Sequence, residues 1–194
     1  MSTHPHTQLS DKDLERTAQV IHAGDYAVQT ERPISTLLGS CVAVCLFDPK
    51  LGMGGMNHFL LPGMKKSENS DVDVLLAGDF AMEVLVNAML AKGAIKSRLV
   101  AKAFGGGNVI SSLKIAIGDR NASFAREWLA RENIPLITSD LGGSWARKVV
   151  CVPGTGEVLC RRVVTDREAM PEIVEEILYE ESLHVPKAGR IELF

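Results

Sequence analysis

Short, mostly apolar segments, each ended by a turn residue, occupy much of the first third of the chain. Residues 34–38, 41–47 and 56–61 are the clearest of them. Segments of this length predict strands, because a helix needs ten or more residues with apolar side chains at every third or fourth position. In residues 41–47 both alternating faces are apolar, which predicts a strand that is buried on both sides.

The apolar pattern becomes helical in the middle of the chain. From about residue 72 to residue 92, apolar side chains recur at spacings of three and four, and Gly93 follows as a left-handed helix end. A second helix is predicted over about residues 120–132 with Asp119 as its N-cap, and a third over about residues 170–182.

Further strands are predicted around these helices. They cover residues 19–28 (two short strands about a turn at Gly24), 98–104, 134–138, 145–152 and 157–164. The sequence Pro-Gly-Thr-Gly at 153–156 predicts a hairpin between the last two. Because strands outnumber helices and hairpins occur near both ends, we predict an α+β fold (an α/β sandwich). Its sheet is mixed, mostly antiparallel and flanked by helices.

The length of 194 residues predicts one domain with short tails. We expect a flexible N-terminal tail at 1–16, the domain at 17–165, and a C-terminal helix and tail at 166–194. A net charge of −3 argues against a nucleic-acid partner. No apolar run approaches the roughly 20 residues of a membrane span. Because the N-terminus also lacks the apolar core of a signal peptide, we expect a cytoplasmic protein with no membrane insertion.

Cys41 and His58 are the residues that most clearly indicate chemistry. They lie 17 residues apart on two strand-like segments joined by a loop, so the thiol and the imidazole can meet. This pair is the minimum for a thiolate nucleophile and its base. Gly39 lets a substrate approach the backbone, and the N–H groups of Ser40 and Cys41 can form an oxyanion hole. The alternative is that both side chains only pack in the core.

The other three cysteines, Cys45, Cys151 and Cys160, are predicted to be reduced and structural. Cys151 and Cys160 lie on the two arms of the predicted hairpin and could face each other across it. None of the spacings is that of a zinc site, so no metal is expected.

Two further groups of residues have simple structural interpretations. The three glycines at 105–107 lack the lysine of a phosphate-binding loop, and they predict a tight strand end that another segment approaches closely. The basic pairs at 147–148 and 161–162 are predicted to lie on a solvated face of the hairpin.

Several segments together resemble the chemoreceptor glutamine deamidases of bacterial chemotaxis, the CheD family. They are residues 38–44 (LGSCVAV), 55–62 (GMNHFLLP), 104–108 (FGGGN), 117–121 (IGDRN) and 140–143 (DLGG) with 147–148 (RK). They occur in order within residues 17–165, and the closing residues 189–194 (GRIELF) also resemble a tail found in the family.

The resemblance implies a fold akin to the catalytic domain of cytotoxic necrotizing factor toxins. It implies hydrolysis of selected glutamine amides of methyl-accepting chemotaxis proteins to glutamate, through a cysteine thioester and without a cofactor. Cys41 is then the nucleophile and His58 the base. The family's third polar residue, a threonine six positions before the cysteine, corresponds to Ser35, and Thr36 is next to it. Either hydroxyl can orient His58, and Ser35→Ala is expected to cost more than Thr36→Ala.

Two other functions are compatible with the same residues. One is a non-catalytic adaptor that binds receptors or a CheC-type phosphatase, although intact Cys41 and His58 argue against it. The other is a thiol methylesterase or amidase that acts on another protein, in which only the substrate pocket would differ.

Overall fold

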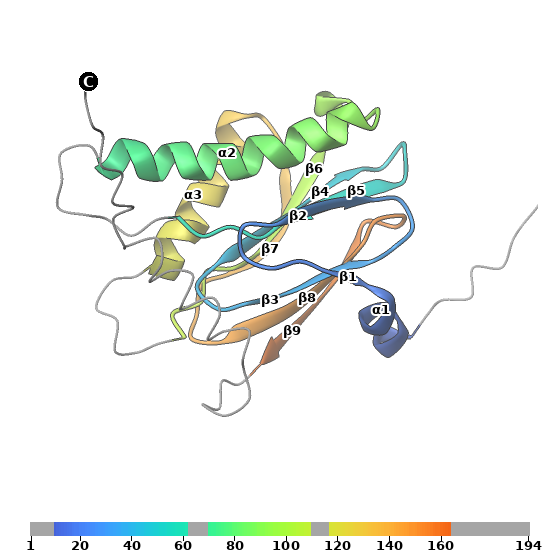
Figure 1. Cartoon of the computed structure of the whole chain (residues 1–194), viewed down its shortest axis with the longest axis horizontal. Coiled ribbons are helices and arrows are strands. Elements are labelled where there is room, and N and C mark those ends of the chain that lie inside the picture. The colour runs from blue at the N-terminus through green and yellow to red at the C-terminus, as the bar shows by residue number, and fades with distance from the viewer. Residues whose placement is uncertain (1–9, 62–69, 110–116, 164–194) are drawn as a thin grey trace, which may run out of the picture.

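The computed structural model describes residues 10–61, 70–109 and 117–163. In this part of the chain two β-sheets pack face to face, and two helices cover the outer face of the larger sheet (Figure 1). The α+β prediction is therefore confirmed, although the strands form two sheets. The predicted helix at 170–182 lies outside the described residues.

The larger sheet has five strands in the order β2-β5-β4-β6-β7. Their bounds are Tyr26–Gln29 for β2, Met53–Asn57 for β5, Val42–Asp48 for β4, Val100–Gly105 for β6 and Leu136–Leu141 for β7. β6 and β7 pair in parallel, and the other neighbours are antiparallel. A parallel pair needs a crossover connection, and helix α3 (Ile117–Arg131) lies in that connection.

The smaller sheet has the order β1-β3-β8-β9. Its strands are Gln19–Val20 for β1, Ile34–Leu38 for β3, Ala146–Val152 for β8 and Glu157–Val163 for β9. β3 lies parallel to β1 and antiparallel to β8, and β8 and β9 form the predicted hairpin. Cys151 pairs with Val158 and Cys160 pairs with Val149. The two cysteines are therefore not directly opposite each other, although the sequence allowed that arrangement.

Helices α2 (Ser70–Ala91) and α3 form the outer layer above the larger sheet (Figure 1). Gly93 ends the α2 region with φ of 97°, as predicted. A 3-10 turn, η1 (Lys96–Arg98), leads into β6. A short helix α1 (Asp11–Thr17) forms where the sequence indicated only a tail, and its N-cap is Ser10, whose hydroxyl accepts a hydrogen bond from the Asp13 N–H.

Strand β4 connects the two apolar layers of the protein, because all seven of its residues are buried. Val42, Val44 and Leu46 pack among the residues beneath the helices. Ala43, Cys45 and Phe47 point the opposite way, into the layer between the two sheets. The prediction that residues 41–47 are buried on both faces is confirmed.

Two predicted element boundaries were wrong. The strand predicted at residues 56–61 is β5, which begins at Met53 and ends at Asn57, before His58. It begins earlier than predicted because Gly54 and Gly55 lie inside the strand and do not form a turn. A Cβ atom on Gly55 would lie 2.8 Å from the Leu85 side chain, so this strand needs glycine for close packing. Helix α3 begins at Ile117, which places Asp119 in its first turn and not at the N-cap.

Arg147 also contradicts the sequence prediction, because it is fully buried and not part of a solvated face. Its guanidinium donates to the Asp140 carboxylate at 2.9 Å and to the Gly142 carbonyl at 2.6 Å. The Asp140 carboxylate and two carbonyls hold the cation inside the protein, as a buried charge requires. Arg161 and Arg162 are exposed, as predicted.

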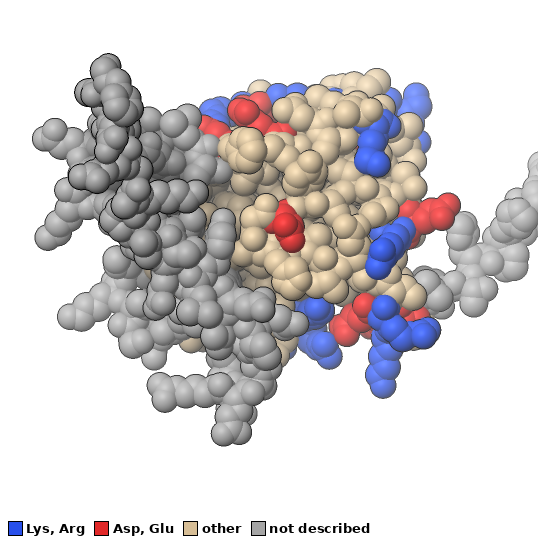
Figure 2. All heavy atoms as spheres, in the orientation of Figure 1, with Lys and Arg blue, Asp and Glu red and all other residues tan. Residues whose placement is uncertain are grey.

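Acidic and basic side chains are interspersed on the face of the molecule that Figure 2 shows. Among the described residues on this face no continuous basic stripe is visible.

Candidate active site

Cys41 lies directly before β4, at the end of the turn that follows β3. The glycine segment after β6 holds this turn: Gly106 N–H donates to the Cys41 carbonyl at 2.7 Å, and Gly107 N–H donates to the Gly39 carbonyl at 2.8 Å. A Cβ atom on Gly105 would lie 2.2 Å from the Cys41 carbonyl oxygen. The prediction that residues 105–107 form a tight strand end with a close neighbour is confirmed.

His58 lies directly after β5 and is fixed through its backbone. Its N–H donates to the Asp25 carbonyl at 3.0 Å, and its carbonyl accepts from the Gly24 N–H at 2.8 Å. The next residue, Phe59, forms an antiparallel bridge with Val42, with both N–H···O bonds present at 2.9 and 3.0 Å. The bridge therefore joins the His58 segment to the Cys41 segment.

The bridge places the thiol and the imidazole on the same face. With Val42 opposite Phe59, Cys41 lies opposite Leu60, and His58 is its diagonal neighbour two residues away. Diagonal neighbours have Cβ atoms roughly 7 Å apart or less, within reach of an imidazole ring. Consistent with this geometry, Cys41 and Leu60 belong to the apolar layer between the sheets, whereas Val42 and Phe59 belong to the layer beneath the helices.

The His58 ring is held by Thr36 of the smaller sheet. The Thr36 hydroxyl lies 2.8 Å from Nδ1 and donates to the Ile21 carbonyl at 2.8 Å. A hydroxyl has one proton, and the Thr36 hydroxyl already donates it to the Ile21 carbonyl. Toward His58 this hydroxyl must therefore accept a hydrogen bond from Nδ1–H. Nδ1 then carries the proton of the neutral ring, and Nε2 carries the lone pair. This tautomer makes Nε2 the base nitrogen.

The base nitrogen is sheltered from water. His58 is 4% exposed, and within the described part of the chain Nε2 is buried without a hydrogen-bond partner. Burial, with a smaller effect from the positive charge of His22, lowers the pKa of His58 from 6.5 to about 3. The ring is therefore neutral at rest, as a general base must be.

Of the two candidate hydroxyls, that of Ser35 makes no hydrogen bond to the His58 ring. Ser35 is fully buried, but its hydroxyl has no hydrogen-bond partner among the described residues. Side chains alternate along a strand, so Ser35 and Thr36 of β3 point to opposite faces. The hydroxyl that contacts the ring therefore belongs to Thr36.

We therefore expect Thr36→Val to reduce turnover more than Ser35→Ala. Valine keeps the shape of threonine but cannot accept from Nδ1–H, so the ring loses its fixed tautomer. A loss of about 10-fold or more is expected, within the range of general-base catalysis. Turnover and the melting temperature of both variants should be measured together. If Ser35→Ala lost more turnover than Thr36→Val at equal stability, Ser35 and not Thr36 would be the residue that orients His58.

Asn121 joins the two halves of the candidate site, and no sequence pattern indicated a chemical role for it. Its side-chain N–H donates to the Ser40 carbonyl at 2.9 Å, and its side-chain oxygen accepts from the Leu61 N–H at 3.0 Å. It lies in the first turns of α3 and is fully buried. The only sequence sign of it was its place in the 117–121 motif.

The other thiols are poorly suited to attack. A hydrogen bond with Cys151, together with burial, raises the pKa of Cys45 well above its ordinary value. Burial and the Asp140 carboxylate raise the pKa of Cys160. All four cysteines lie in the described residues, and none forms a disulfide. The protonated form of a thiol is a weak nucleophile, which supports a structural role for Cys45 and Cys160.

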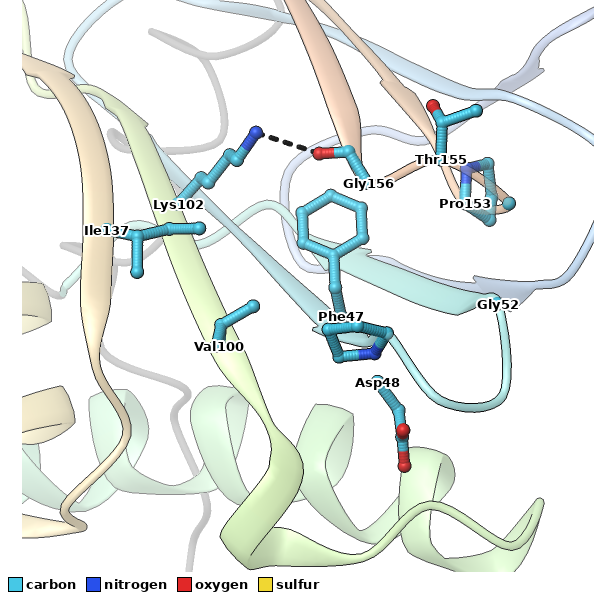
Figure 3. Close-up of a pocket in the computed structure, with 11 residues that line it drawn as sticks. Phe47, Asp48, Gly52, Val100, Lys102, Ile137, Pro153, Thr155 and Gly156 are labelled. Carbon is cyan, nitrogen blue, oxygen red and sulfur yellow. Dashed lines mark hydrogen bonds between the residues drawn. The ribbon is translucent and has the colours of Figure 1, made fainter.

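A cavity of about 220 Å³ lies at the opposite end of β4 (Figure 3). Phe47, Lys102 and Ile137 line it together with the hairpin turn at 153–156, and Lys102 donates to the Gly156 carbonyl at 2.8 Å. Its lining includes neither a thiol nor an imidazole, so it is separate from the Cys41–His58 pair.

Within residues 10–61, 70–109 and 117–163, no three histidine, cysteine or acidic residues gather in a way that could hold a metal ion. In the same residues, no helix is long and apolar enough to cross a membrane.

Comparison with known proteins gives consistent results. The family model for CheD chemotactic sensory transduction matches residues 60–162. A probable chemoreceptor glutamine deamidase CheD 2 of Dechloromonas aromatica is 51% identical over 97% of this chain and 99% of its own. A protein of the same name from Burkholderia thailandensis is 41% identical over 95% and 96%.

Among solved structures, the Bacillus licheniformis hypothetical protein YfiH aligns with 60% of this chain and 50% of its own at a TM-score of 0.41 and 14% identity. This likeness is too distant to define a shared fold, and similarity to the cytotoxic necrotizing factor domain stays a prediction. The family match and the near full-length relatives, by contrast, leave no ambiguity: the chain belongs to the CheD family.

Proposed function

We propose that this chain is a chemoreceptor glutamine deamidase that converts selected glutamine side chains of methyl-accepting chemotaxis proteins to glutamate. Family membership supports the substrate class. The observation that carries the chemistry is the Thr36–His58 hydrogen bond, which leaves the lone pair of Nε2 on the face shared with Cys41. We also propose that the protein acts in the cytoplasm and needs no cofactor.

The first half of the proposed reaction releases ammonia. His58 Nε2 takes the thiol proton while Cys41 Sγ attacks the carbonyl carbon of the glutamine amide. The carbonyl oxygen becomes an oxyanion, which the backbone N–H groups of Ser40 and Cys41 stabilise. The imidazolium then gives its proton to the amide nitrogen, the C–N bond breaks, and a thioester and ammonia are formed.

The second half restores the enzyme. Neutral His58 takes a proton from water as the water oxygen attacks the thioester carbonyl. The C–S bond then breaks, and the Cys41 sulfur recovers the proton from His58. The products are the free thiol and a glutamic acid side chain. The acid then gives its proton to the released ammonia or to water and becomes glutamate, so atoms and charge balance over the cycle. The protons that move while bonds to carbon form and break pass through Nε2, which is why the tautomer fixed by Thr36 matters.

The proposal is tested by intact-mass analysis of a receptor cytoplasmic fragment after incubation with the protein. Deamidation adds about 1 Da per modified site, and peptide mapping identifies the glutamines. Unchanged mass with retained binding would favour the adaptor function. Loss of methyl groups from a methylated fragment, with glutamines intact, would favour a methylesterase. Binding to a CheC-type phosphatase is a separate proposal from the same family resemblance.

The low pKa of His58 predicts a specific pH dependence of stability. The unfolded ring binds a proton near pH 6.5, whereas the folded ring rejects it until about pH 3. The unfolded state therefore binds more protons between these values, and the free energy of unfolding falls as the pH is lowered through that range. The slope from one such group is at most about 1.4 kcal/mol per pH unit.

Urea titrations at pH 7.5 and 5, on the wild-type protein and His58→Gln, measure this effect. The wild-type protein should lose more stability between the two pH values than the variant does. Equal losses would show that the folded ring titrates like an exposed histidine.

A further inference from the structure

Asn121 connects the loop that carries the nucleophile to the loop that carries the base. Ser40 directly precedes Cys41, and Leu61 lies three residues after His58. One buried amide group bonds to both backbones, at 2.9 Å to the Ser40 carbonyl and at 3.0 Å to the Leu61 N–H. The two loops come from different parts of the chain, so Asn121 bridges them from a third element.

The Asn121 amide suits both of these hydrogen bonds because it carries a donor and an acceptor on one rigid group. The Ser40 carbonyl can only accept and the Leu61 N–H can only donate, so the group between them must donate on one side and accept on the other. A carboxylate of the same size would satisfy Leu61 and place a second acceptor against the Ser40 oxygen. The two partners therefore fix the orientation of the amide and disfavour a carboxylate at this position.

Two further contacts connect the start of helix α3 to these loops, one directly and one through the glycine segment after β6. The Arg120 guanidinium donates to the Leu61 carbonyl at 2.9 Å. On the other side, a Cβ atom on Gly118 would lie 2.4 Å from the Gly106 carbonyl oxygen, and the Gly106 N–H holds the Cys41 carbonyl. The start of α3 therefore contacts both loops at close range, which limits how far either loop can move.

We propose that Asn121 is a positioning residue that sets the alignment of Cys41 with His58. The role rests on the proposed function, because it matters only if thiol and imidazole act together. Misplacing a catalytic group by about 1 Å can cost about 100-fold in rate. Without Asn121 the bridge between Val42 and Phe59 remains, but the outer ends of both loops lose their common support.

The test compares three variants on the same helix. Asn121→Ala removes both hydrogen bonds, Asn121→Asp removes only the donor, and Leu129→Val reduces packing at a fully buried position away from both loops. At a temperature at which each variant is folded, we expect both Asn121 variants to lower kcat for deamidation about 100-fold with KM nearly unchanged. Leu129→Val should keep its kcat. Equal kcat in Asn121→Ala and Leu129→Val would overturn the proposal.

A second measurement needs no receptor. The rate of Cys41 alkylation by iodoacetamide, followed by peptide mapping, reports how well His58 assists the thiol. Asn121→Ala and His58→Gln should each slow this alkylation, and the double variant should be no slower than His58→Gln alone. Additive losses in the double variant would show that Asn121 acts independently of His58, which would refute a positioning role.

The alkylation assay also separates the two hypotheses. If His58→Gln reacts as fast as the wild-type protein, the thiol and imidazole do not form a pair, and the proposed function fails together with the positioning role. If His58→Gln is slow and Asn121→Ala is normal, the pair stands and only the role of Asn121 is refuted.

Discussion

Replacing Cys41 with alanine is expected to abolish deamidation of a receptor fragment, with a loss of at least about 10⁴-fold in kcat. The proposed thioester needs this sulfur, and removing a nucleophile from a set of cooperating groups removes nearly all of their joint effect. The fold should persist, because the loop is held by the Cys41 carbonyl and its neighbours, which alanine retains. Intact-mass analysis over a time course measures the loss.

The matched control is Cys45→Ala, four residues further along the same buried strand. Cys45 contacts Cys151 in the layer between the sheets, and its raised pKa keeps it protonated. The variant should therefore keep substantial activity, although it loses some packing. If both variants lost activity equally at equal stability, Cys41 would not be the unique nucleophile.

Removing the Asp140 carboxylate is expected to have the largest effect on stability. Among the described residues, Asp140→Ala leaves the fully buried Arg147 cation with two carbonyl acceptors, those of Gly142 and Trp145. Breaking a buried ion pair from one side costs about 3–5 kcal/mol, since the remaining charge has lost its counter-ion. Urea denaturation of the wild-type protein and the variant measures the change in the free energy of unfolding.

Arg162→Ala is the control, because Arg162 bonds to the same carboxylate from an exposed position. An exposed ion pair contributes about 1 kcal/mol or less. The double variant Asp140→Ala with Arg147→Met, which removes the stranded charge, should recover much of the loss. A cost in Asp140→Ala no greater than in Arg162→Ala would mean that Arg147 does not depend on this carboxylate.

The sequence was enough to select Cys41 and His58 as candidates but not to choose the hydroxyl that contacts the His58 ring. Cys41 and His58 were identifiable because each is a reactive side chain beside a strand-like segment. The choice between Ser35 and Thr36 depends on which face of β3 meets His58. A shift of one residue in register reverses that face, and the register is set by a sheet partner more than 100 residues away.

Arg147 and Asn121 show a second limit. An arginine next to a lysine on a predicted hairpin is typical of an exposed, charged face. Arg147 is buried because it pairs with Asp140 of the other sheet, and the sequence does not show that the two residues meet. In the sequence, Asn121 is a polar residue near the start of a predicted helix, which indicates no particular function. Its function as a bridge depends on two backbone groups that are far from it in sequence, and no local pattern contains that information.

The candidate site draws its groups from both sheets: Cys41 and His58 lie beside strands β4 and β5 of the larger sheet, and Thr36 belongs to the smaller one. A partly folded chain whose larger sheet had formed alone would already hold thiol and imidazole together. Its ring would still exchange between the two neutral tautomers. The reactivity of Cys41 therefore depends on the packing of the smaller sheet against the larger one. A partly folded chain that lacks this packing should hydrolyse glutamine amides more slowly than the folded protein.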